Sequence, residues 1–140
     1  MKNTTTFLLL ILFSFSCAKE SPEAQIKKLT GYWEIVNVKL PDGSMKEFNP
    51  GITLDYINVT GDQGIRKKVT AQLDGSFLTN DSAEKFSLKI ENDSLRLYYE
   101  TPFHKWHETV LKAKDSILVV QNSDHKIYTY KKFRKFNSYE

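Results

Sequence analysis

The sequence predicts an all-β protein, and within that class an antiparallel up-and-down β-barrel of eight to nine strands. Apolar and polar residues alternate with a period of two along most of the chain, whereas helical periodicity is nearly absent. Turn signals such as Asp74-Gly75 separate the alternating segments at short intervals. Strands joined in this way would leave exposed edges, and closure into a barrel removes them. A β-sandwich and a half-open barrel are the alternatives that the pattern leaves open.

The first 16 residues have the layout of a secretory signal peptide. Lys2 precedes an apolar run at residues 7–13, and small residues follow just before Cys17. The apolar run is only about a third of the roughly 20 residues that a transmembrane helix needs. We therefore expect residues 1–16 to be a signal peptide that is removed from the mature protein.

Cys17 is the only cysteine of the chain, so no disulfide can support the fold. Residues 14–17 resemble a lipobox, in which small residues precede a cysteine that receives lipid. Several acyl chains on one residue give a durable membrane anchor, whereas a single chain binds only marginally. We therefore expect a lipid-anchored protein of the bacterial cell envelope, at the outer membrane. The alternative is a free or buried thiol after a plain signal peptide.

The polar segment that follows the signal is expected to be a tether. Residues 17–28 comprise the lipidated cysteine and this tether, and residues 29–140 form the barrel domain. A short helical turn can begin at Ser21, because Pro22 suits the first position of a helix. The whole chain carries 20 basic and 17 acidic residues, a net charge of +3, and loss of Lys2 with the signal leaves +2. This mild charge excludes few classes of partner.

Nine segments of the remaining chain show the alternation expected of strands. In residues 85–90, for example, Phe86 and Leu88 share one face. Farther upstream, Val69 lies on the face opposite Arg66. The expected strands are residues 32–40, 52–60, 65–73, 77–80, 85–90, 95–100, 105–113, 117–121 and 127–133.

A cluster of basic residues lies at the end of the last expected strand and directly after it. It consists of Lys131, Lys132, Arg134 and Lys135. One interpretation is a solvated terminal strand, and the other is attraction to anionic lipid head groups close to the anchor. Nucleic acid is not expected as a partner, because the protein is expected outside the cytoplasm.

The segment Gly31-Tyr32-Trp33 is similar to the Gly-x-Trp signature of lipocalins and of lipocalin-like domains in bacterial lipoproteins. The resemblance implies that Trp33 closes one end of an eight-stranded barrel and that Gly31 lets the chain pass beneath it. It also implies a basic residue over the indole ring, for which Arg134 is preferred and Lys132 is the alternative. Such a contact contributes about 0.5–2 kcal/mol. The family's Thr-Asp-Tyr motif has no counterpart in a later loop, which argues against a large ligand cavity.

Metal ligands and nucleophiles show no pattern typical of a site. His104 and His107 are three residues apart, so their side chains point to opposite faces of a strand. Glu108 shares a face with His104, but the third candidate, His125, lies in an expected turn. The serines fall mainly in turns, and no Gly-x-Ser-x-Gly elbow is present. We therefore expect no enzyme, no cofactor and no metal ion.

Aromatic side chains with a polar group are the candidates for ligand binding. The interior of an eight-stranded barrel is either filled by side chains or holds one small ligand. Tyr98, Trp106, Tyr128 and Tyr130 lie among apolar neighbours and would suit an amphipathic guest. The sequence therefore predicts a non-enzymatic module that binds a small hydrophobic ligand. The alternative is an envelope interaction protein with a filled barrel that docks a protein partner.

Overall fold

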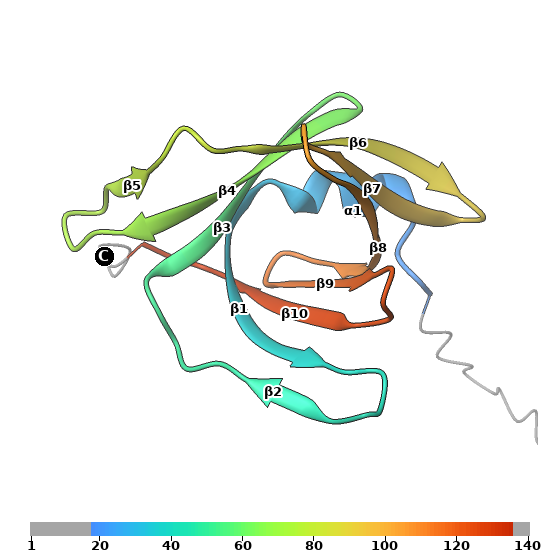
Figure 1. Cartoon of the computed structure of the whole chain (residues 1–140), viewed down its shortest axis with the longest axis horizontal. Coiled ribbons are helices and arrows are strands. Elements are labelled where there is room, and N and C mark those ends of the chain that lie inside the picture. The colour runs from blue at the N-terminus through green and yellow to red at the C-terminus, as the bar shows by residue number, and fades with distance from the viewer. Residues whose placement is uncertain (1–17, 136–140) are drawn as a thin grey trace, which may run out of the picture.

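A computed structural model describes residues 18–135, so the expected signal peptide and Cys17 lie outside the described residues. The chain folds into an antiparallel β-barrel (Figure 1). Two short strands, β2 (Met45–Glu47) and β5 (Phe77–Thr79), extend the wall beside β1 and β4. The eight barrel strands are β1 (Gly31–Lys39), β3 (Thr53–Thr60), β4 (Gln63–Ala71), β6 (Glu84–Glu91), β7 (Ser94–Glu100), β8 (Lys105–Ala113), β9 (Ile117–Asn122) and β10 (Ile127–Lys132).

Pairing of the first barrel strand with the last closes the barrel. Trp33 lies opposite Lys132 at one end of this pair, and Lys39 lies opposite Ile127 at the other. The closed antiparallel barrel predicted from the sequence is therefore confirmed, and the sandwich and the half-open barrel are excluded. All nine expected strands are present. The sequence did not predict β2, because its three residues are all exposed and give no alternation of buried and exposed positions.

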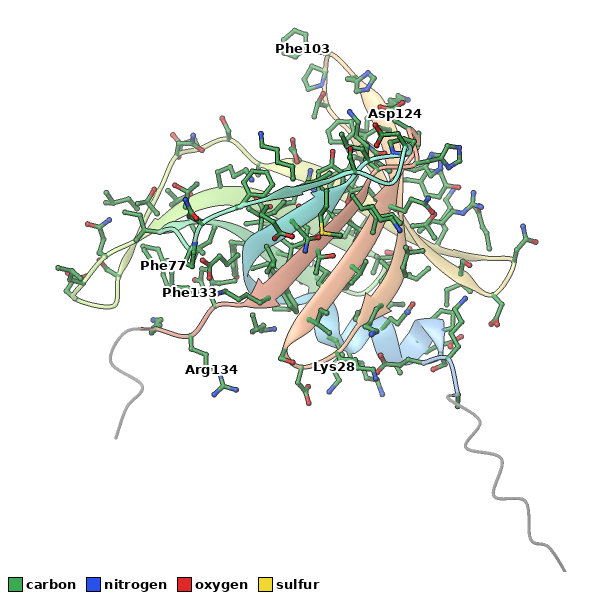
Figure 2. The ribbon with its side chains drawn as sticks, turned by 90° about the horizontal axis from the view of Figure 1, so that it is seen from below. Lys28, Phe77, Phe103, Asp124, Phe133 and Arg134 are labelled. Atoms are coloured by element: carbon green, nitrogen blue, oxygen red, sulfur yellow. The ribbon has the colours of Figure 1, made fainter. Side chains whose placement is uncertain are left out.

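The barrel has two different ends. One end, which we call the closed end, carries the tight turns at residues 61–62, 92–93 and 114–116. The other, the open end, carries the longer loops and lies at the top of Figure 2, where Phe103 and Asp124 are labelled. Two strand pairs separate toward this open end. β1 pairs with β3 only at residues 31–33, and β4 pairs with β6 only at residues 63–66.

Helix α1 (Pro22–Leu29) covers the closed end and contacts β3, β7 and β8. Ser21 caps the helix, because its Oγ accepts a hydrogen bond from the backbone N–H of Ala24 at 3.2 Å, and Pro22 occupies the first turn. The helical turn expected at Ser21 is thus confirmed. Residues 22–28, expected as part of the tether, instead belong to the folded domain, since Gln25 and Leu29 bury one face of α1. None of the helices in residues 18–135 is long and apolar enough to cross a membrane.

The barrel interior is packed with apolar side chains from helix α1 and from every barrel strand except β4. Leu29 of the helix and Trp33 are completely buried at its closed end. The buried members of this core are Leu29, Trp33, Ile57, Phe86, Leu88, Leu95, Leu97, Tyr99, Val110, Ala113, Leu118, Val120 and Tyr130.

A second apolar cluster lies on the outside of the wall, over β3 and β4. Val69 of β4 is buried there although it faces away from the barrel, because Phe77 of β5 and Phe133 cover this surface (Figure 2). The Tyr32 ring stacks on the Phe77 ring with 4.0 Å between centroids. The alternation expected in β4 is confirmed, but its apolar face points outward, and Arg66 on the opposite face points into the barrel.

Candidate functional site

Trp33 forms the closed end of the barrel interior. Its indole N–H donates a hydrogen bond of 2.8 Å to the carbonyl oxygen of Leu29, which joins β1 to α1. The ammonium of Lys132 lies 4.4 Å from the centroid of a Trp33 ring and donates to the carbonyl oxygen of Thr30 at 2.7 Å. Partial burial lowers the pKa of Lys132. A basic side chain therefore covers the indole face in a cation–π contact.

The basic residue over Trp33 is Lys132 and not Arg134, which corrects the preferred assignment. The register of β1 and β10 pairs Trp33 directly with Lys132, so both side chains lie on the same face of the sheet. Arg134 follows the end of β10, is exposed, and points away from the barrel in Figure 2. Gly31 is also explained by Lys132. Its φ is +147°, and a Cβ atom at this position would overlap Lys132 Nζ.

The four aromatic residues expected to bind a ligand do not surround one cavity. Tyr130 is buried in the interior, and Tyr128 packs against the core from the same strand. Trp106 lies between two rings, with 4.9 Å to Tyr99 and 5.5 Å to His104.

The structure corrects the prediction most clearly for Tyr98, which faces the outside of the barrel. Its hydroxyl donates to Glu91 Oε2 at 2.7 Å, and its ring lies 5.5 Å from that of His107. The parity of β7 decides this, because the neighbouring Leu97 and Tyr99 both point inward.

A buried network of charged side chains fills the interior near the open end. Arg66 of β4 donates to Glu108 Oε1 at 3.2 Å and to Glu84 Oε2 at 2.9 Å. Its guanidinium also lies 4.6 Å from the centre of the Tyr99 ring. Burial raises the pKa of Glu108, although Arg66 opposes this shift. An ion-paired network therefore occupies the barrel interior near the open end.

The space left inside the barrel is very small. A cavity of about 10 Å³ lies between Trp33 and the charged network. This volume corresponds to about one water molecule, whereas sites for small molecules usually measure roughly 300–1,000 Å³. The barrel interior of this structure is filled.

A larger cavity lies at the open end, where β4 and β6 separate. It measures about 520 Å³, and we call it the mouth. Asp55 and Arg66 line both the mouth and the small interior cavity, so they form its floor. Phe103, which is 96% exposed, stands on its rim at the top of Figure 2. The lining residues are Asp55, Arg66, Lys67, Lys68, Asn80, Asp81, Ser82, Ala83, Glu84, Thr101, Pro102 and Phe103.

The mouth combines buried charge with exposed apolar surface. Asp55 is 5% exposed, and its Oδ1 lies 2.5 Å from Lys68 Nζ in an ion pair. Glu84 binds Arg66 from the rim, and its side chain is 42% exposed. The mouth therefore offers charged and hydrogen-bonding groups on its floor and an aromatic ring above them. The sequence does not reveal this site, because no local pattern shows that Arg66 and Lys68 face inward.

The candidate metal ligands do not converge. Across residues 18–135 the structure contains no group of three or more His, Cys, Asp or Glu side chains that could hold a metal ion. His104 stacks on Trp106, and His107 lies on the outer face beside Tyr98.

A comparison with known protein families agrees with the fold. The family model of a lipocalin-like domain matches residues 29–120. A lipocalin-like protein from Bacteroides uniformis is among the similar solved structures, with a TM-score of 0.48 and 12% sequence identity. That match covers 76% of this chain and 99% of the other. No curated protein matches the sequence.

Proposed function

The chain belongs to the lipocalin-like domain family, and from this premise we propose that it is a non-enzymatic protein that binds one small amphipathic ligand in the mouth. The cavity volumes are the observation that carries this proposal. The mouth measures about 520 Å³ and falls within the usual range of ligand sites, whereas the interior measures about 10 Å³ and does not.

The lining of the mouth supports an amphipathic ligand. Pro102 and Phe103 offer apolar surface at the rim, and removing an exposed aromatic ring from water favours binding. The floor offers Arg66 and Asp55, which bind the polar end of the ligand. Arg66 and Asp55 keep their ion pairs, but a purely hydrophobic ligand would displace water from them without supplying a hydrogen bond in exchange, which costs free energy.

The proposal includes a lipid anchor on Cys17, as expected from the lipobox-like segment. Helix α1 begins at Pro22 on the closed end of the barrel, five peptide steps from Cys17. Five steps span at most about 17 Å, so the anchor holds the closed end near the bilayer. The mouth is at the opposite end and would face away from the membrane, accessible to a dissolved ligand. The proposed location is the bacterial envelope, at the outer membrane.

Native mass spectrometry of the protein extracted from its own membrane tests both parts. We expect a co-purifying small molecule, and an intact mass that corresponds to a chain starting at an acylated Cys17. Phe103→Ala should lose most of the bound molecule, because it removes the apolar rim while leaving the core unchanged. Leu73→Ala is the matched control, since Leu73 is 85% exposed and lies outside the mouth.

Two results would contradict these proposals separately. Equal ligand occupancy in Phe103→Ala and the unmodified protein would exclude the mouth as the site. An unacylated mass for the membrane-extracted protein would exclude the anchor and leave the ligand proposal standing.

The filled interior also supports the alternative function, docking of a protein partner on the outer wall. A filled barrel leaves its outer surface as the second place where binding can occur.

A further inference from the structure

A groove of about 600 Å³ crosses the outer face of β6, β7 and β8. Strand pairing places Ser87, Tyr98 and His107 side by side in one row across these strands. The next row toward the open end contains Lys85, Glu100 and Lys105. These residues alternate with the buried Phe86 and Tyr99, so the side chains of both rows project from the barrel. The groove is separate from the mouth, and the two share no lining residue.

The charged side chains of the groove leave an excess of positive charge. Lys85, Lys89 and Lys105 contribute three cations and Glu100 contributes one carboxylate, a net charge of +2. Glu100 already forms an ion pair of 2.9 Å with Lys105. Neither Lys85 nor Lys89 lies within ion-pair distance of a carboxylate in residues 18–135. Two ammonium groups are therefore available to an anionic partner.

The positions of these two lysines indicate the shape of that partner. Lys85 and Lys89 lie on the same face of β6, four residues apart, and their Cα atoms are separated by roughly 13 Å. An extended peptide with carboxylates four residues apart has the same spacing. Gln63, Ser87 and His107 lie in the groove beside the lysines and can form hydrogen bonds with a polar chain.

The aromatic residues of the groove argue against a sugar ring or a nucleic-acid base as the occupant. Such rings stack on an open aromatic face, and the Tyr98 ring already contacts two other side chains. The Lys89 ammonium lies 5.1 Å from the centroid of the Tyr98 ring, and the His107 ring packs against it as well. Trp106 is likewise held between Tyr99 and His104. The groove is therefore better suited to a charged ligand that forms hydrogen bonds than to a ligand with flat rings.

We propose that this groove docks an extended acidic segment of a protein partner, with carboxylates that pair with Lys85 and Lys89. The contact is small and polar, so it is weak and transient. Because the lysines are exposed, salt screens the attraction, and the affinity falls as the ionic strength rises.

Titration of the full chain with a synthetic peptide tests the proposal. The probe is an extended peptide of about ten residues with glutamates four residues apart, and its counterpart has glutamine at both positions. We expect the glutamate peptide to bind at low salt and to shift the NMR signals of Ser87, Tyr98 and His107. Binding should weaken strongly at about 0.3 M salt, and the glutamine peptide should not bind.

Charge-neutralising variants provide the matched control. The double variant Lys85→Gln/Lys89→Gln should weaken binding by about tenfold. Lys112→Gln/Lys114→Gln removes the same charge from exposed residues outside the groove and should leave binding unchanged. Ligand occupancy of the mouth should be normal in both double variants, so a failure of this proposal is distinguishable from a failure of the mouth proposal.

Three outcomes would overturn the proposal. Equal loss of affinity in both double variants would show attraction to net charge alone. NMR shifts confined to other surfaces would place the peptide elsewhere. Binding of a sulfated oligosaccharide or of anionic lipid vesicles as tight as that of the glutamate peptide would refute a peptide-specific groove.

Discussion

Different interactions fill the interior at the two ends of the barrel. At the closed end, Trp33 and Leu29 are completely buried, and helix α1 covers them. At the open end, Arg66 joins Glu84 and Glu108 inside the wall, and the strands separate into the mouth. Apolar side chains stabilise the fold by packing alone. A buried charged side chain is stable only when an opposite charge or a ligand pairs with it. The closed end therefore supports the fold, and the open end is where we propose that the ligand binds.

The largest expected effect is that of removing a tryptophan from the closed end. Trp33→Ala should lower the free energy of unfolding by about 3–5 kcal/mol, because it leaves a cavity in a packed interior. The half-buried Trp106 at the open end is the matched comparison, and Trp106→Ala should cost only about 2 kcal/mol. Urea denaturation of both variants measures the difference. Equal losses would mean that the two ends are equally important for stability.

An effect of about 3 kcal/mol is expected from breaking the charged network at the open end. Arg66→Met removes the cation and leaves the carboxylate of Glu108 buried without its partner. The double variant Arg66→Met/Glu108→Leu should recover most of this loss, because no unpaired charge remains. Lys105→Met is the control, since its exposed pair with Glu100 contributes less than about 1 kcal/mol. Failure of the double variant to recover would indicate that the ion pair itself stabilises the barrel.

The smallest expected effect concerns the pH dependence of stability, to which the two ends of the barrel contribute differently. Burial raises the pKa of Glu108 above its usual 4.5, so the folded state binds this proton more tightly than the unfolded state. Its contribution to the free energy of unfolding therefore falls as the pH rises from 4.5 through the raised pKa. At the closed end, hydrogen bonding and charge from Lys28 lower the pKa of Asp115 below 3.8. Its contribution is present above pH 3.8 and is lost as the pH falls through the lowered pKa.

Urea denaturation between about pH 3 and pH 8 separates these two contributions. Glu108→Gln should reduce the loss of stability on the alkaline side of pH 4.5 and leave the acidic side unchanged. Asp115→Asn should reduce the loss on the acidic side only. A change on the acidic side in Glu108→Gln, or on the alkaline side in Asp115→Asn, would contradict this assignment of the two pH-dependent contributions.

Sequence patterns predicted the strands more accurately than the site. Phe86 and Leu88 alternate with polar residues, and β6 forms where this pattern lies, with both side chains in the core. The Gly-x-Trp signature likewise identified Trp33 as the buried residue that closes one end. Period-two alternation is a local property of the chain, so it can be read without knowing what lies beside a strand.

The candidate site could not be predicted in the same way. Arg66 and Val69 have the polar and apolar pattern of an ordinary half-buried strand, which suggests that Val69 faces the core. In the structure β5 and Phe133 cover Val69 from outside, and Arg66 points into the barrel, where Glu108 from a distant strand pairs with it. Tyr98 was misassigned for the same reason, since alternation separates two faces without saying which is inside.

The amino-acid sequence alone was enough to predict the class of fold, nine of the ten strands and the packed tryptophan of the closed end, and it is the basis for the proposed lipid anchor on Cys17. Tertiary structure decided which face of β4 and β7 is inside, that Lys132 covers Trp33, that residues 22–28 belong to the domain, and that the interior is filled. The physical reason is that local patterns report the alternation of neighbouring residues. Burial, register and charge pairing depend on segments that meet only after the chain has closed into a barrel.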